Sequence, residues 1–203
     1  MLKYSYTLLA PIYDAIVSRA TQPMREQSLE QLGNIQGKSV LLAGVGSGLD
    51  LPLLPKGAHY TGVDITPAML DKAQRRHKKF KPELKLELEL EQGNAMALPY
   101  TDYQYDIVIM HLILAVVSNP LKALQEASRV TKHGGRILIL DKFIKPGQLA
   151  LGRRFLNIFI RHVATRTDVV FEKLLEQCPE LHKVRDDPAK LSSWFRCIEL
   201  KKV

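Results

Sequence analysis

Short apolar runs bounded by turn-forming residues recur along the chain and predict buried β-strands. These runs are Ser39–Ala43, His59–Asp64, Asp106–His111 and Arg136–Asp141. The stretch Leu84–Glu91 differs, because its leucines alternate strictly with charged residues. Such alternation is typical of a half-solvated strand at the edge of a sheet.

Segments with helical periodicity lie between the apolar runs. They are Arg19–Leu32, Pro67–Lys78, Pro120–Thr131 and Leu149–Val163. The first turn of a helix tolerates proline, which fits the prolines that open the second and third segments. Asp64 or Thr66 is expected to cap the second helix, and Gly134-Gly135 is expected to end the third.

The alternation of strands and helices predicts a doubly wound α/β domain with a parallel sheet. Two further strands, Val184–Asp187 and Trp194–Lys201, lie close together in sequence, so we expect them to pair antiparallel. One domain is expected in 203 residues. We divide it into an N-terminal cap and first helix (1–33), a cofactor-binding half (34–141), a lid-like basic amphipathic segment (142–178) and terminal antiparallel strands (179–203).

A glycine-rich turn follows the first predicted strand, with the pattern G-x-G-x-G over Gly44–Gly48. A helix is expected to start beyond this turn and to offer free backbone N–H groups. Alone, the triplet is compatible with a simple tight turn. Asp64, however, lies 20 residues after Gly44 at the end of the next strand, where a carboxylate can accept both ribose hydroxyls. The spacing favours a nucleoside without a pyrophosphate, which needs G-x-G-x-x-G.

A third polar position, Asn94, follows the alternating strand in the stretch Gly93–Tyr100. Its side chain can hydrogen-bond the edge of an adenine, although by itself the stretch would be a surface turn. A fourth group of residues extends from Pro120 through Gly134-Gly135 to Asp141.

Taken together, these motifs resemble the class I S-adenosylmethionine-dependent methyltransferases over about residues 5–200. Within that family, the chain is most similar to the branch of the ubiquinone/menaquinone-biosynthesis and bacterial phosphatidylethanolamine N-methyltransferases. The resemblance implies a Rossmann-like sheet of seven strands, mostly parallel with the last strand reversed, and helices on both faces. It implies S-adenosyl-L-methionine as the cofactor, bound by Gly44, Val45, Gly46, Gly48, Asp64, Ile65, Asn94, Ala95 and His111.

Within that set, the resemblance gives each group a separate part of the cofactor. The glycines would lie under its methionine and ribose, and Asp64 would bind the ribose hydroxyls. Ile65 would pack on the adenine, whose edge Asn94 and Ala95 would meet. His111 would lie beside the methyl group.

Two positions depart from the family's pattern. Leu42 stands where an acidic residue usually supports the amino-acid end of the cofactor, and Asn94 stands where the family often has Asp. Asn retains an acceptor, so that change is the milder of the two. Leu42 leaves open a non-catalytic cofactor-binding subunit as an alternative to an enzyme.

Three residues are candidates for a catalytic role. His111 interrupts an apolar strand end and titrates near neutral pH, which suits a general base. The alternative for His111 is a core histidine with a hydrogen-bond partner. Tyr13 and Asp14 belong to an N-terminal segment that closes over the cofactor in related enzymes, or that forms a fraying arm.

The composition is that of a globular protein, with 46% hydrophobic and 25% charged residues and a net charge of +8. Two stretches without acidic residues, 72–81 and 142–167, carry the excess positive charge. The first is interpreted as a solvated helix end. The second contains the basic amphipathic stretch Leu149–Val163, which suits a lid or dimer helix, or an anionic membrane surface.

Cys178 and Cys197 have no metal-like spacing, so we expect no metal and a reduced, cytoplasmic protein, with peripheral contact to a membrane as an extension. The N-terminus resembles neither a signal nor a transit peptide. The predicted enzyme methylates a small or lipid-like acceptor, first a phosphatidylethanolamine-type amine. The alternatives are C- or O-methylation of a quinone precursor, and a soluble amine or thiol. Few aromatic residues and no base-flipping motif disfavour nucleic acid, and the sequence leaves the oligomeric state open.

Overall fold

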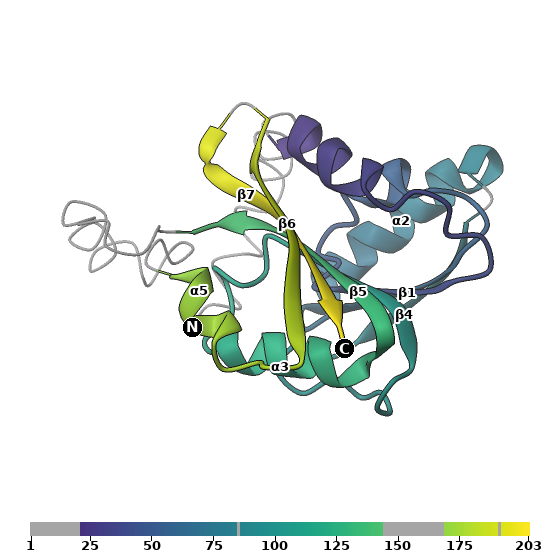
Figure 1. Cartoon of the computed structure of the whole chain (residues 1–203). Helices are drawn as coiled ribbons and strands as arrows, with labels where there is room; N and C mark the ends of the chain where they lie inside the picture. Colours follow the sequence, from purple (N-terminus) through teal and green to yellow (C-terminus); the bar gives the residue numbers. More distant parts are fainter. Residues whose placement is uncertain (1–20, 85, 144–168, 191) are drawn as a thin grey trace.

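The computed structural model describes residues 21–84, 86–143, 169–190 and 192–203, which form one α/β unit (Figure 1). Residues 21–30 are helical. The strands are β1 (Ser39–Ala43), β2 (His59–Asp64), β3 (Glu87–Gln92), β4 (Tyr105–His111), β5 (Thr131–Lys142), β6 (Leu181–Ala189) and β7 (Ser192–Lys202). The other helices are α2 (Pro67–Leu84), α3 (Pro120–Val130), α5 (Phe171–Leu175) and the single-turn 3-10 helix η1 (Leu51–Leu53).

The seven strands form one sheet in the order β3-β2-β1-β4-β5-β7-β6. Neighbours from β3 to β5 pair parallel, whereas β7 pairs antiparallel with both β5 and β6. The predicted fold is therefore confirmed, including the reversed last strand and the edge position of β3. The chain leaves β1 toward one edge and returns through β4 on the other side, which places the switch point of the topology between β1 and β4.

Helices cover both faces of the sheet (Figure 1), and the side chains under each layer of helices form a separate apolar cluster. Successive strand residues point to opposite faces. Leu41 and Val108 thus belong to the cluster with α3 and α5, while Leu42 and Ile109 belong to the cluster with residues 21–30 and α2. Leu42 is 2% exposed, so it fills the second core rather than facing the cleft described below.

Several predicted boundaries were wrong by a few residues. α2 continues six residues past Lys78 to Leu84, and β3 accordingly begins at Glu87 rather than Leu84. α3 ends at Val130, because Thr131 already has extended backbone. β5 begins at Thr131, and its register with β4 shifts before Arg136. The Gly134-Gly135 pair therefore lies inside an irregularity of β5, and does not end the helix.

The prediction of a helix directly after the glycine-rich turn was also wrong. The chain forms only the 3-10 helix η1, and Leu54 after it has extended backbone. Pro52 lies inside η1 and Pro55 follows it. Proline removes a backbone donor and disfavours helical backbone in the residue before it, which explains why the turn does not propagate.

The basic stretch 72–81 lies on α2. α2 connects the end of β2 to the start of β3, and these two strands pair parallel, so α2 runs from the cleft edge of the sheet back to the opposite edge. Arg75, Lys78 and Lys79 are exposed on it. Most of the predicted lid, with Leu149–Val163, lies outside the described residues, as do Tyr13 and Asp14. In the part of the chain that the structure describes, no helix is long and apolar enough to cross a membrane.

Candidate functional site

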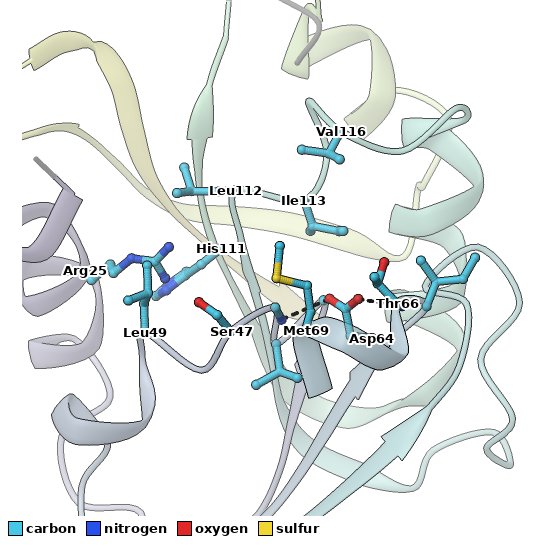
Figure 2. A pocket seen from close by; sticks show the side chains of 14 residues that line it. Arg25, Ser47, Leu49, Asp64, Thr66, Met69, His111, Leu112, Ile113 and Val116 are labelled. Carbon is cyan, nitrogen blue, oxygen red and sulfur yellow. Dashed lines mark hydrogen bonds between the residues drawn. The ribbon is translucent and has the colours of Figure 1, made fainter. Parts of the chain in front are cut away.

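A cleft opens at the carboxyl ends of β1, β2 and β4 and consists of two arms that share lining residues, of which Figure 2 shows the first. The glycine-loop arm is lined by Arg25, Gly44, Val45, Gly46, Ser47, Leu49, Met69, His111 and Leu112. The Asn94 arm is lined by Val63, Gly93, Asn94, Ala95, Met96, Val117 and Ser118. Asp64, Ile65 and Thr66 contact both arms, as do Gly44, Ile113 and Val116. Most sequence-predicted binding residues thus meet in one cleft at the switch point of the sheet.

Asp64 lies at the junction of the two arms and is held by backbone donors. Its Oδ2 accepts from the Gly46 N–H at 2.9 Å, and its Oδ1 accepts from the Thr66 N–H at 2.9 Å. Burial raises the pKa of this carboxyl, and the hydrogen bonds from Thr66 and Gly46 oppose the shift. The Thr66 side chain and the Ile65 N–H also hydrogen-bond Asp64, so a ribose hydroxyl would share or replace one of these donors.

The glycine loop is fixed from both sides. The N–H groups of Gly44 and Val45 both donate to the carbonyl of Val63, at 2.8 and 2.9 Å. From α2, Arg76 donates to the carbonyl oxygen of Ser47 and, at 3.3 Å, to its hydroxyl. The loop is therefore anchored to β2 and α2 by hydrogen bonds within the protein.

Two glycines in the loop have positive φ and close neighbours. Gly44 has φ +83°, and a Cβ there would lie 2.7 Å from Ile113 Cδ1, in the wall of the cleft. Gly48 has φ +77°, and its Cβ would lie 3.1 Å from the backbone of Ala73 in α2. Gly48 lines neither arm, so its position is explained by close packing against α2.

We expect Gly44→Ala to weaken the binding of S-adenosylhomocysteine, the product form of the expected cofactor, about tenfold. Left-handed backbone costs an alanine roughly 1–2 kcal/mol, and Ile113 must move into the cleft. Titration calorimetry measures the change. Gly134→Ala is the matched control, because Gly134 has φ +72° but no atom within 4 Å of the added Cβ. Equal losses of affinity in both variants would contradict a specific role for the space around Gly44.

The Asn94 arm is lined almost entirely by apolar groups. Asn94 itself forms a local turn, since its Oδ1 accepts from the Met96 N–H at 2.9 Å. Ala95 is buried, and Ile65 is 46% exposed at the entrance of the cleft. A flat, uncharged ring suits this apolar slot, because on binding it would cover the exposed side chain of Ile65.

His111 lies at the end of β4 with both ring nitrogens engaged. Nδ1 is 3.0 Å from Asp50 Oδ1, and Nε2 is 2.9 Å from Ser28 Oγ. Nδ1 faces the Asp50 carboxylate, and Nε2 shares a hydrogen bond with the Ser28 hydroxyl, so neither ring nitrogen is free. Its side chain is 1% exposed. The geometry matches the alternative of a buried, partnered histidine more closely than that of a free base.

The loop after β4 forms the wall that both arms share. Leu112 adopts φ +57°, uncommon for a residue with a side chain, and its N–H donates to Leu140 O at 2.7 Å. Asp141 Oδ2 accepts from the Ala115 N–H at 3.0 Å. Burial raises the pKa of Asp141 to about 6, although hydrogen bonds from the backbone lower it. β5 thus fixes the wall of the cleft.

Arg25, Ser28 and Asp50 pack around His111, and the sequence pattern did not identify them as site residues. Arg25 and Ser28 lie on the core-facing stripe of the helix over residues 21–30, beside Leu29. Polar residues on such a stripe are a signal that was available in the sequence. Their partners are 25 to 83 positions away, so the sequence pattern does not indicate which residues they contact.

Comparison with known proteins gives a consistent family. Residues 41–139 match the family described as a methyltransferase domain. A phosphatidylethanolamine N-methyltransferase of Cereibacter sphaeroides is 29% identical over 192 residues, which cover 94% of this chain and 93% of the relative. A demethylmenaquinone methyltransferase of Tropheryma whipplei (strain Twist) is 29% identical over 182 residues, covering 87% of this chain and 68% of the relative.

Solved structures show the same fold at lower identity. A SAM-dependent methyltransferase from Aquifex aeolicus is similar with a TM-score of 0.60 at 18% identity, covering 88% of this chain and 89% of its own. A geranyl diphosphate methyltransferase, solved with GPP and sinefungin, has a TM-score of 0.73 at 16% identity, covering 88% of this chain and 76% of its own.

Proposed function

This chain is an S-adenosylmethionine-dependent methyltransferase of class I, and from that premise we propose that it N-methylates a phosphatidylethanolamine-type amine. The observation that supports this acceptor is the match with a phosphatidylethanolamine N-methyltransferase over 94% of this chain and 93% of the relative. A quinone precursor is the second candidate, because a demethylmenaquinone methyltransferase is equally identical, although over only 68% of its length.

The residues of the cleft fit S-adenosylmethionine in three respects. Asp64 presents a carboxylate at the junction of the arms, held by Gly46 and Thr66, and we propose that it binds the ribose there. The apolar Asn94 arm suits the adenine, with Ile65, Asn94 and Ala95 around it. The glycine-loop arm, with Gly44, Val45 and Gly46, is left for the methionine end and the reacting methyl group.

The bound cofactor supplies an activated methyl group on a good leaving group, so the protein contributes mainly alignment and exclusion of water. In this proposal the wall residues Leu112 and Ile113 keep the reacting end dry, and the loop anchors on β2 and α2 keep it aligned. We propose His111 as a positioning residue, because Asp50 and Ser28 occupy both its nitrogens. If a base is needed, Tyr13 and Asp14 are the remaining candidates, and they lie outside the described residues.

The proposal extends to contact with an anionic membrane surface through the basic stretch 142–167. The cations on α2 do not support this contact, since α2 runs away from the cleft. Flotation with liposomes, with and without anionic lipid, tests the extension. A protein that stays at the bottom of the gradient in both cases contradicts it.

The acceptor is tested by a radiolabelled methyl assay on three substrate pools. We expect label in the organic phase with phosphatidylethanolamine liposomes, and none with a demethylated quinone or with aqueous amines and thiols. Heat-treated protein and the cofactor alone are the controls. Transfer to the quinone alone would replace the first acceptor by the second, and transfer only to aqueous metabolites would contradict both.

A further inference from the structure

The two arms of the cleft differ in charge. Both contact Asp64, but the lining of the Asn94 arm contains no other charged side chain, whereas the glycine-loop arm contains Arg25 and His111. A nucleoside bound with its ribose at Asp64 therefore sends one substituent into an apolar slot and the other toward a guanidinium. S-adenosylmethionine has a neutral ring at one end and an amino acid at the other, so this asymmetry sets its direction.

Arg25 reaches the cleft from the helix over residues 21–30, and its side chain lies beside Leu49 and His111 (Figure 2). The residue is 7% exposed. Its Nε donates to Thr21 Oγ1 at 3.1 Å, and its Nη1 donates to Asp50 Oδ1 at 2.7 Å. These two contacts fix the plane of the guanidinium.

The guanidinium has donors to spare. Of its five N–H groups, two are used in the contacts to Thr21 and Asp50, and Nη2 makes no hydrogen bond to any of the residues that the structure describes. Nη2 is not among the fully buried side-chain atoms that lack a partner, so its N–H groups reach solvent. Because Arg25 lines the glycine-loop arm, that arm is where its unused donors can find an acceptor.

Leu42 removes one expected anchor for the amino-acid end of the cofactor. Related enzymes use an acidic residue at this position to support the amino-acid end of the cofactor, whereas Leu42 is packed in the apolar core under residues 21–30. Arg25 belongs to the helix that covers this same face. A basic residue on that helix would bind the carboxylate of the amino-acid end. An acidic residue at position 42 would instead have bound its ammonium.

We propose that Arg25 binds the carboxylate at the methionine end of S-adenosylmethionine, with Asp50 holding the guanidinium in place. The inference rests on the proposed function and adds the residue that determines how the cofactor is oriented. The same donor chemistry would suit a phosphate of the acceptor, so the experiment must separate these two oxyanions.

The test is a cycle of two ligands and two proteins, measured by titration calorimetry without any acceptor. S-adenosylhomocysteine carries the carboxylate, and 5′-methylthioadenosine has the same nucleoside and sulfur but lacks the amino acid. We expect Arg25→Met to weaken S-adenosylhomocysteine about 30-fold, since a charge-assisted pair is lost. The affinity for 5′-methylthioadenosine should change less than about threefold.

A second variant guards against misfolding. Arg25→Met leaves Asp50 buried without its main partner, so Arg25→Lys is measured in parallel, because it keeps a positive charge near Asp50 but loses the planar, bidentate geometry. We expect an intermediate loss for S-adenosylhomocysteine only. Arg75→Met, on the exposed face of α2, is the matched control and should bind both ligands like the wild type.

The outcomes distinguish a failure of the Arg25 assignment from a failure of the proposed function. Equal losses for both ligands in the Arg25→Lys protein, or no loss for either, would overturn the assignment of the carboxylate; the second result would point to an oxyanion of the acceptor instead. Wild-type protein that binds neither ligand would contradict the proposed function itself. A loss confined to S-adenosylhomocysteine supports the proposal.

Discussion

Replacing Asp64 by alanine is expected to lower the affinity for S-adenosylhomocysteine about 100-fold or more. Two ribose hydroxyls would lose a charged acceptor, and each such hydrogen bond contributes about 1.5–3 kcal/mol. The loss is increased because the N–H groups of Gly46 and Thr66 would also lose their acceptor, which loosens the glycine loop. Titration calorimetry measures the effect, and circular dichroism establishes that the variant is folded.

Two comparisons make the Asp64 result specific. Asp64→Asn keeps the size and one acceptor but removes the charge, so we expect it to fall between alanine and the wild type. Asp71→Ala removes an exposed carboxylate on α2, near in sequence but outside the lining of both arms, and should leave the affinity unchanged. Wild-type affinity in the Asp64→Ala protein would refute its assignment to the ribose.

Replacing Asp50 by alanine is expected to lower the free energy of unfolding by about 3–5 kcal/mol. Asp50 is 4% exposed and faces two partners, Arg25 Nη1 at 2.7 Å and His111 Nδ1 at 3.0 Å. Removing Asp50 leaves the buried guanidinium of Arg25 without its counter-charge. Losing one partner of a buried ion pair destabilises a protein more than replacing both partners by apolar groups. Denaturant titration followed by circular dichroism provides the measurement.

The double variant Asp50→Leu/Arg25→Met supplies the control. Replacing both charges by apolar groups removes the unpaired guanidinium, so stability should return to near that of the wild type. If Asp50→Ala is no less stable than this double variant, the buried pair does not contribute as argued. The double variant should still bind S-adenosylhomocysteine weakly, because it lacks Arg25.

The lowered pKa of Asp50 predicts how the free energy of unfolding depends on pH. Burial alone would raise the pKa of Asp50, but the charges of Arg25 and His111 outweigh it and hold the pKa far below its ordinary value. A lowered pKa in the folded state adds stability above the pKa of the unfolded chain, and this stability is lost as the pH falls below it. The wild type should therefore lose stability relative to Asp50→Leu/Arg25→Met as the pH falls into the acid range.

Much of the cleft was accessible from the sequence because its signals are local. The apolar runs and the glycine turn identify β1 and β2, and Asp64 follows from its place at a strand end. The edge position of β3 follows from its alternating leucines. These features depend on neighbours within a few residues, which is the range over which hydrophobic periodicity and turn chemistry operate.

The parts that sequence analysis missed depend on distant contacts. The cluster of Ser28, Asp50 and His111 with Arg25 joins three segments, and no short pattern records such a meeting. The failed helix after the glycine loop is different. Pro52 and Pro55 are local signals against a helix there. The prediction instead followed the glycine-rich turn, which often precedes a helix.

The place of β7 has a consequence for the order in which the chain folds. β7 is the last strand in sequence but lies between β5 and β6, and it pairs with both over most of their length. On the ribosome, β5 and β6 are therefore made before the strand that joins them. Until residues 192–202 emerge, β5 presents an open apolar edge, the kind of surface on which nascent chains associate wrongly. The nascent chain would therefore depend on chaperones until residues 192–202 have left the ribosome and paired with β5 and β6.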